Sequence, residues 1–96
     1  MYDVIYLVKA RKELEQAVYW YEDKQPGLGI RFIAEVEKKL TVIMVQPDRY
    51  AIKKKNLRET KVQDFPYTIV YKVDEERKCI TITSVFHVKR NPESGY

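Results

Sequence analysis

The final strand-like segment of the chain ends in three residues that could act on phosphate groups. His87, Lys89 and Arg90 stand almost side by side in the sequence. Histidine transfers protons near neutral pH, and a neighbouring arginine can stabilise the charge that develops on phosphorus during phosphodiester cleavage. A single histidine at a strand end is more often hydrogen-bonded to the backbone in a structural role. Both interpretations stay open.

A basic cluster precedes these residues. Between Lys53 and Lys61 five side chains are basic and only Glu59 is acidic. The cluster could bind phosphates or an acidic protein, or supply a lysine whose pKa is lowered by its neighbours. It could equally be an exposed hairpin whose lysines discourage edge-to-edge pairing of sheets. Its basic members are Lys53, Lys54, Lys55, Arg58 and Lys61.

One ribonuclease site can be assembled from these residues. Cleavage through the 2′-hydroxyl needs a base for that hydroxyl, a cation for the developing charge and an acid for the leaving oxygen. The candidates are Lys53 from the lysine run, Arg58 and Arg90 for charge, and His87 as acid or base. Because the chain has one histidine, the partner of His87 has to be a lysine or a tyrosine.

Aromatic side chains accompany the basic ones. They could stack on nucleic-acid bases, although such residues are more often core or interface material. Tyr21 and Phe86 fall on apolar stripes and are expected in the core, whereas Tyr19 or Trp20 falls off the stripe and is an interface candidate. The residues expected to bind a partner are Lys53, Lys54, Lys55, Arg58, Lys61, Lys89, Arg90 and Trp20.

Other common sites are not predicted. One cysteine, Cys79, and one histidine cannot form a cysteine–histidine zinc cluster, so neither a metal nor a cofactor is expected. Gly27-Leu28-Gly29 follows a helical pattern, and its spacing fits neither the Rossmann nor the P-loop motif. The helical glutamates are interpreted as solvated faces rather than catalytic pairs. They are Glu13, Glu15, Glu22, Glu35 and Glu37.

Length and composition indicate a single domain over residues 1–96. Hydrophobic residues make up 45% of the chain and charged residues 33%, which predicts a thin core under a heavily charged surface. The net charge of +4 arises entirely from residues 47–96, where eleven basic residues face seven acidic ones. The single cysteine and the absence of a signal-like or membrane-length apolar segment predict a cytoplasmic chain without membrane contact.

Within the first quarter of the chain, the spacing of the apolar residues changes from that of a strand to that of a helix. Residues 2–8 are short, β-branched and aromatic, as in a strand. From Ala10 to Tyr21 apolar residues follow at i, i+4, i+7, i+8 and i+11, which predicts a helix to about Lys24. Pro26-Gly27 then ends it.

A second apolar stripe, from Phe32 to Ile43, predicts another helix that ends near Gln46, because Pro47 disfavours helical geometry in the residue before it. The joint is short, so the helices should lie antiparallel and pack on the sheet through their stripes. The packing residues are expected to be Leu14, Ala17, Val18, Tyr21, Phe32, Val36, Leu40 and Ile43.

The rest of the chain, from Arg49 onward, is predicted to form strands. Arg49–Lys54 and Leu57–Gln63 predict a hairpin around Lys55-Asn56, Tyr67–Val73 alternates, and Cys79–Val88 forms the last strand after a charged turn. In that last strand Ile80, Ile82, Phe86 and Val88 are expected on one side, and Thr81, Thr83, Val85 and His87 on the other.

This order of elements predicts an α+β domain. It consists of an N-terminal strand and an antiparallel helical hairpin packed on one face of a mostly antiparallel sheet of three to four strands.

Four segments match a known family in order and spacing. They are ELEQAVYWYEDKQPGLGIRFIAEVEKKL (Glu13–Leu40), QPDRY (Gln46–Tyr50), FPYTIVYKV (Phe65–Val73) and SVFHVKRNP (Ser84–Pro92). Together they cover nearly the whole chain and resemble the RelE/ParE toxin superfamily of type II toxin–antitoxin systems, particularly its ParE-like plasmid-stabilisation branch.

The resemblance implies a toxin that is neutralised by a cognate antitoxin. RelE-like members enter the ribosome and cleave mRNA, using Lys and Arg on the sheet with a C-terminal Tyr or His. ParE-like members trap DNA gyrase instead. The matching positions here are Arg58, Lys53 or Lys55, Arg90 and His87. The chain departs from the RelE-like pattern in its longer helical hairpin and in lacking a clear tyrosine after the last strand.

Three functions therefore remain open. The first is a ParE-like inhibitor of DNA gyrase. The second is a ribosome-dependent mRNA endoribonuclease, and the third is an inactive member that only binds a partner or nucleic acid. The neighbouring reading frame is expected to encode a short acidic antitoxin.

Overall fold

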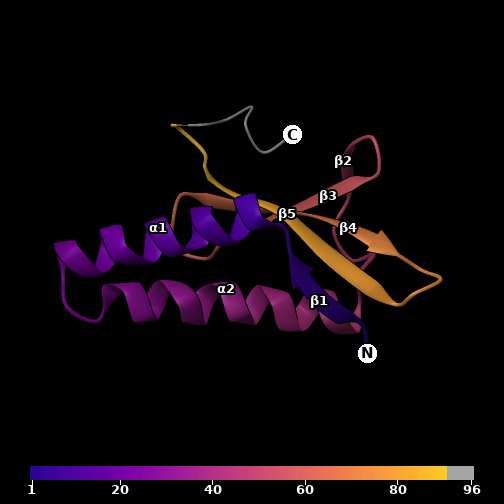
Figure 1. The fold of residues 1–96 in the computed structure, drawn as a ribbon, viewed down its shortest axis with the longest axis horizontal. Helices are drawn as coiled ribbons and strands as arrows, with labels where there is room; N and C mark the ends of the chain where they lie inside the picture. Colours follow the sequence, from indigo (N-terminus) through magenta and orange to yellow (C-terminus); the bar gives the residue numbers. More distant parts are fainter. Residues whose placement is uncertain (91–96) are drawn as a thin grey trace.

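The computed structural model describes residues 1–90, so residues 91–96 lie outside the description. Two antiparallel helices form one layer, and a twisted sheet extends from it (Figure 1). This arrangement confirms the predicted α+β class with its helical hairpin. In chain order the elements are β1 (Asp3–Tyr6), α1 (Val8–Lys24), α2 (Leu28–Val45), β2 (Ile52–Lys54), β3 (Leu57–Lys61), β4 (Tyr67–Asp74) and β5 (Cys79–His87).

The sheet has five strands in the order β1-β5-β4-β3-β2. The strands from β2 to β5 pair antiparallel in succession, as predicted, whereas β1 pairs parallel with β5. The sequence pattern predicted three to four strands. The sheet has five, because the N-terminal strand β1 joins it. A parallel pair needs a long connection between its strands, and here both helices and three strands supply it.

The loop between the helices depends on two glycines and one carboxylate. Gly27 has a φ of 90°, a conformation that side chains disfavour. A Cβ on Gly29 would lie 2.7 Å from the Val18 carbonyl oxygen, so the helices approach closely only because this residue is glycine. The Glu22 carboxylate accepts hydrogen bonds from the N–H groups of Gly27 (2.8 Å) and Gly29 (3.0 Å) and caps α2.

The core lies between the helical stripes and the near face of the sheet. Five of the eight predicted stripe residues are buried and the other three pack against them, which confirms the stripes. Near the loop end of the hairpin, Phe32 lies 5.3 Å from Tyr21, 5.0 Å from Phe65 and 5.1 Å from Tyr67 between ring centres. The contacts with Phe65 and Tyr67 are edge-to-face and add to the hydrophobic stabilisation. The start of β4 is therefore anchored to both helices.

A β-bulge changes the faces of β5. Ile82 pairs with Tyr71 and Ser84 with Val70, so Thr83 is an extra residue in the ladder. Beyond it the side-chain alternation is reversed. Val85 and His87 therefore share the helix-facing side with Ile82, and Phe86 is buried on the opposite side. The predicted grouping of Val85 and His87 with Thr81, and of Phe86 with Ile82, was wrong because it assumed an uninterrupted period of two.

Candidate functional site

A groove of about 280 Å³ separates the middle of α1 from the end of β5. The strand β1 covers only the first half of β5, since its pairing ends at Ile82. Past that point α1 lies beside the strand, and side chains from both elements form the walls. The lining residues are Glu13, Gln16, Ala17, Trp20, Tyr67, Val85, Phe86, His87 and Arg90.

Arg90 forms the charged wall of this groove. Its Nη2 donates a 2.9 Å hydrogen bond to the Tyr67 hydroxyl, and its guanidinium carbon lies 5.7 Å from the centre of the Trp20 ring. The second contact is a cation–π interaction. Burial raises the pKa of Tyr67, while the charge of Arg90 opposes that rise. Three elements, α1, β4 and the turn after β5, therefore hold one guanidinium.

His87 lies beside Arg90 and is bound through one nitrogen. Its Nδ1 accepts hydrogen bonds from the backbone N–H groups of Lys89 (3.1 Å) and Arg90 (3.2 Å). Its ring meets that of Tyr67 edge-on at 5.2 Å. Burial lowers the pKa of His87, and the positive charges of Arg90 and Lys89 lower it further. Both effects favour the uncharged imidazole.

Glu13 closes the side of the groove next to β5. Its Oε1 accepts hydrogen bonds from Ser84 Oγ (2.9 Å) and from the Val85 N–H (3.0 Å). The Val85 N–H faces away from β4, so the carboxylate satisfies a donor on the unpaired edge of the strand. Lys9 Nζ approaches the same carboxylate at 3.4 Å. The interpretation of Glu13 as a merely solvated residue was therefore wrong.

Sequence reasoning gave no site role to two groove residues, Glu13 and Gln16, and considered Tyr67 only as one of the aromatic side chains that could stack on bases. A signal for Glu13 exists in the sequence, because it lies three residues after Ala10 and four before Ala17, at the border of the buried stripe. Nothing in the sequence pairs it with Ser84, which is 71 residues away.

The basic cluster of residues 53–61 (the hairpin cluster) lies on β2, β3 and the turn between them. Lys53, Lys54, Lys55 and Lys61 are exposed, and Lys55 occupies the turn with a φ of 54°. Among residues 1–90, none of the ion pairs involves Lys53, Lys55 or Lys61. These three lysines therefore present uncompensated positive charge on a solvent-facing hairpin.

Arg58 differs from the lysines around it because its side chain is held by the rest of the fold and is not free in solvent. It is half-buried on β3, and its Nη1 donates a 2.6 Å hydrogen bond to the Tyr50 carbonyl oxygen. It pairs across the sheet with Tyr71, whose hydroxyl donates to the Pro47 carbonyl oxygen at 2.9 Å. Burial raises the pKa of Tyr71 to about 12, although the charge of Arg58 opposes it.

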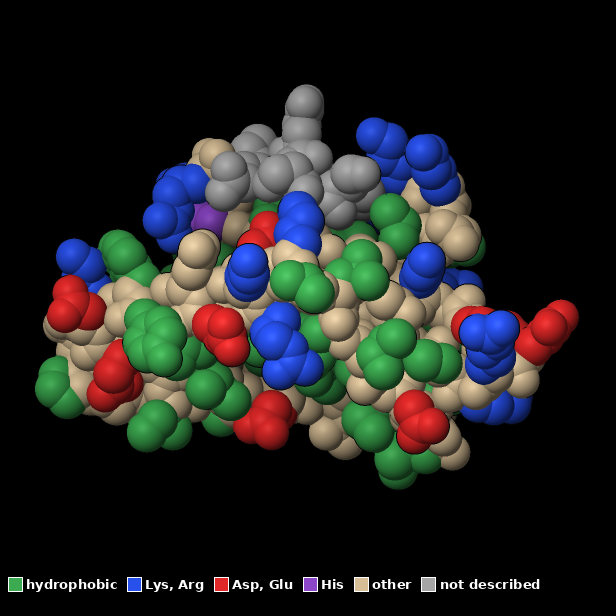
Figure 2. Space-filling model, in the orientation of Figure 1, with side chains coloured by type: hydrophobic (Ala, Val, Ile, Leu, Met, Phe, Trp, Pro, Cys, Tyr) green, Lys and Arg blue, Asp and Glu red, His purple; other side chains and the backbone are tan. Residues whose placement is uncertain are grey.

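The structure brings His87, Lys89, Arg90 and Trp20 together and leaves the hairpin cluster apart from them. Arg58 is opposite Tyr71, whereas His87 is opposite Tyr67, on the other side of β4. Four residues along the strand and two strand spacings place their backbones roughly 16 Å apart. Figure 2 shows the same division, with one group of blue side chains beside the purple histidine and another over the β2–β3 hairpin.

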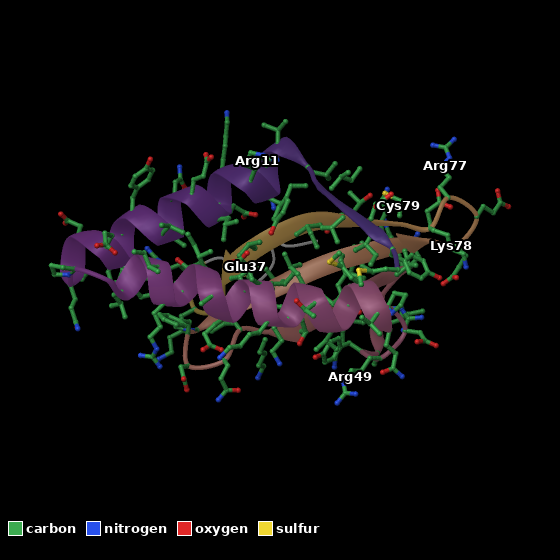
Figure 3. The ribbon with its side chains drawn as sticks, turned by 90° about the horizontal axis from the view of Figure 1, so that it is seen from below. Arg11, Glu37, Arg49, Arg77, Lys78 and Cys79 are labelled. Carbon is green, nitrogen blue, oxygen red and sulfur yellow. The ribbon has the colours of Figure 1, made fainter. Side chains whose placement is uncertain are left out.

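Two further basic residues, Arg77 and Lys78, lie in the turn between β4 and β5, away from both the groove and the hairpin cluster. Arg77, Lys78 and Cys79 lie at the end of the molecule opposite the α1–α2 loop (Figure 3). Residues 1–90 contain no group of three or more histidine, cysteine or acidic residues placed to hold a metal ion. Within the same residues no helix is long and apolar enough to cross a membrane.

Comparisons with known proteins agree with this geometry. Residues 4–92 match the family model described as the ParE toxin of the type II toxin–antitoxin system parDE. No curated protein sequence gives a significant match.

Several solved structures share the fold, and three of them are toxin–antitoxin proteins. A chain of the chromosomal ParDE toxin–antitoxin system from P. aeruginosa superposes with a TM-score of 0.77 at 15% identity, over 93% of this chain and 98% of that one. A chain of the intact E. coli RelBE toxin–antitoxin complex gives 0.69 at 20% identity, over 94% and 100%. The isolated E. coli RelE toxin gives 0.68 at 20% identity, over 94% and 87%.

Proposed function

The chain belongs to the ParE toxin family of type II toxin–antitoxin systems, and from this premise we propose that it arrests growth in the cytoplasm by binding DNA gyrase. Membership of the family implies a cognate antitoxin that neutralises it. Binding, rather than bond cleavage, is the proposed mode of action. One observation carries that choice, namely the arrangement of the residues that a ribonuclease would need.

The candidate catalytic residues do not form one constellation. His87 and Arg90 line the groove, whereas Arg58 lies roughly 16 Å from His87 and is bound to the Tyr50 carbonyl. General acid–base catalysis needs groups within hydrogen-bond reach of the same reacting atoms, about 2.6–3.2 Å. Lys53 lies one strand beyond Arg58, on the edge of the sheet.

The state of His87 also favours binding. A neutral imidazole has one unprotonated nitrogen, and in this chain that nitrogen is Nδ1, which accepts two backbone hydrogen bonds. The proton is therefore on Nε2. With its lone pair occupied, His87 is a poor base for a 2′-hydroxyl, and an uncharged imidazole is a poor acid for a leaving oxygen.

The surface suits an acidic antitoxin. Lys53, Lys55 and Lys61 are exposed charges that an acidic partner could neutralise, and the helices expose apolar side chains such as Tyr19 (75% exposed) and Ile30 (71%) that it could cover. A flexible acidic segment that orders on binding would satisfy both.

A second function has one observation in its favour. His87, Arg90 and the Tyr67 hydroxyl lie in the same groove. These side-chain types could position RNA and move protons during cleavage, as in a ribosome-dependent endoribonuclease.

Expression without the antitoxin separates these functions. The proposal predicts growth arrest with gyrase-dependent double-strand DNA breaks, while translated mRNA stays full-length. Arrest with cleaved mRNA and intact DNA would replace it with the nuclease function. Normal growth at a confirmed expression level would indicate an inactive member that only binds its partner. Co-expression of the neighbouring reading frame should restore growth in the first two cases.

A further inference from the structure

The turn after β5, Val88–Arg90, carries no regular structure of its own, yet it places a guanidinium over an indole ring. Within the described residues its backbone N–H groups are held by Val88 N–H donating to the Pro66 carbonyl (2.9 Å) and by the Lys89 and Arg90 N–H groups donating to His87 Nδ1. The conformation of this turn therefore depends largely on one side-chain acceptor.

We propose that His87 is a positioning residue, a proton-operated latch whose Nδ1 holds the Val88–Arg90 turn and thereby keeps Arg90 between the Tyr67 hydroxyl and the Trp20 ring. Neutral His87 accepts the two N–H groups, and the latch is closed. Protonation places a hydrogen on Nδ1, so the only acceptor becomes a donor and both bonds are lost. Arg90 then leaves the groove wall.

The charges around His87 act in the same direction. On its own turn Lys89 and Arg90 are positive, so a protonated imidazole would be repelled by both residues that it formerly held. From β4 the uncharged Tyr67 presents its ring edge. From α1 the facing carboxylate is Glu13, which is already hydrogen-bonded to Ser84 and Val85 and paired with Lys9.

The direction of the switch follows from these contacts. The folded-state pKa of His87 is lowered by burial first and then by Arg90 and Lys89. The closed turn is therefore complete above the ordinary histidine pKa of about 6.5 and opens as the pH falls through the lower folded value. The groove is complete at neutral pH and loses its charged wall in mild acid.

The composition of the chain makes the latch measurable without knowledge of the target. It has one histidine and one tryptophan, and both line the groove. Imidazole nitrogen NMR therefore reports His87 alone, and intrinsic indole fluorescence reports Trp20 alone. This readout is independent of gyrase and of the antitoxin, so the latch and the proposed function can fail separately.

The test is a pH titration of the isolated chain. We expect Nδ1 to be unprotonated at neutral pH, and the Lys89 and Arg90 amide signals and the Trp20 fluorescence to titrate with the imidazole midpoint, below about 6.5. Because amide exchange is base-catalysed and slows in acid, we compare protection factors, and those of the two amides should fall by roughly tenfold on protonation. Protonation on Nδ1 at neutral pH, or amides and fluorescence that ignore the imidazole titration, would overturn the proposal.

Two substitutions of matched size isolate the acceptor. His87→Asn places an oxygen near the position of Nδ1 and cannot titrate, so it should keep the neutral-pH amide and fluorescence signals and remove their response to acid. His87→Gln places its oxygen one bond farther out, so it should show the open turn at every pH. Arg90→Ala should keep the amide titration and lose that of Trp20. Identical behaviour of the Asn and Gln variants would refute the latch.

Discussion

The groove beside β5 and the hairpin cluster contain similar residue types but differ in how those residues are held. In the groove, Arg90, His87 and Glu13 each have partners from at least one other element, and the aromatic core lies directly beneath. In the hairpin cluster, Lys53 and Lys61 project into solvent from strands at and near the sheet edge. Charge alone therefore does not identify a site, because the groove fixes the position of its charged groups, whereas Lys53 and Lys61 are exposed on the hairpin.

The difference assigns distinct roles. A fixed guanidinium beside an indole can recognise a partner with geometric precision, because little side-chain entropy remains to be lost on binding. Exposed lysines act at longer range, where they accelerate encounter with an acidic partner and are screened by salt.

Removal of Phe32 should have the largest effect, because this fully buried ring supports Tyr67 at the floor of the groove. We expect Phe32→Ala to lower the free energy of unfolding by about 3–5 kcal/mol. The control Ile52→Ala removes a side chain on β2, next to the hairpin cluster, that is 53% exposed, and should change the free energy of unfolding by less than about 0.5 kcal/mol. Urea denaturation measures both, and equal losses would show that the two regions share one core.

Glu13→Ala tests whether the edge of β5 needs its carboxylate. The substitution leaves the Val85 N–H and the Ser84 hydroxyl without that acceptor, so we expect a loss of about 1–3 kcal/mol. Glu15→Ala, at an exposed position on the same helix, is the matched control and should be close to neutral. If the two variants were equally stable, the contact would contribute nothing.

Tyr71 supplies a pH test at the hairpin end of the sheet. Its folded-state pKa of about 12 lies above the ordinary value of about 10, so it contributes stability at neutral pH that is lost as the pH rises from about 10 to about 12. Tyr71→Phe should be less stable at pH 7, because the Pro47 carbonyl loses its donor, and should lose less stability between those pH values. Parallel curves for variant and wild type would contradict this account.

Charge reversal in the hairpin cluster should leave stability almost unchanged and alter association with the antitoxin. We expect Lys53→Glu with Lys61→Glu to slow association by about tenfold or more at low salt and to flatten its salt dependence. Arg77→Glu with Lys78→Glu changes the net charge equally at the β4–β5 turn, which lies at one end of the molecule (Figure 3). Stopped-flow rates that fall equally for both pairs would show that only net charge matters.

Local patterns predicted the elements well. The 3.6-residue stripes located both helices, and the lysine–asparagine turn located the β2–β3 hairpin, because these signals depend on neighbouring residues. The faces of β5 beyond Thr83 were not predicted, since one bulged residue reverses an alternation that the sequence alone leaves uninterrupted. The groove was half predicted. His87, Arg90 and Trp20 were recognised by type, but Glu13 and Tyr67 join them only through long-range packing.

Expression of the double variant His87→Asn with Arg58→Ala without antitoxin decides whether this toxin acts by binding or by cleavage. His87→Asn is expected to keep the turn acceptor while removing proton transfer, and Arg58→Ala removes the second candidate catalytic residue; folding is checked by circular dichroism. We predict that growth arrest and gyrase-dependent DNA breaks persist, with translated mRNA intact. A folded variant that grows normally, beside a wild type that cleaves mRNA, would contradict the account.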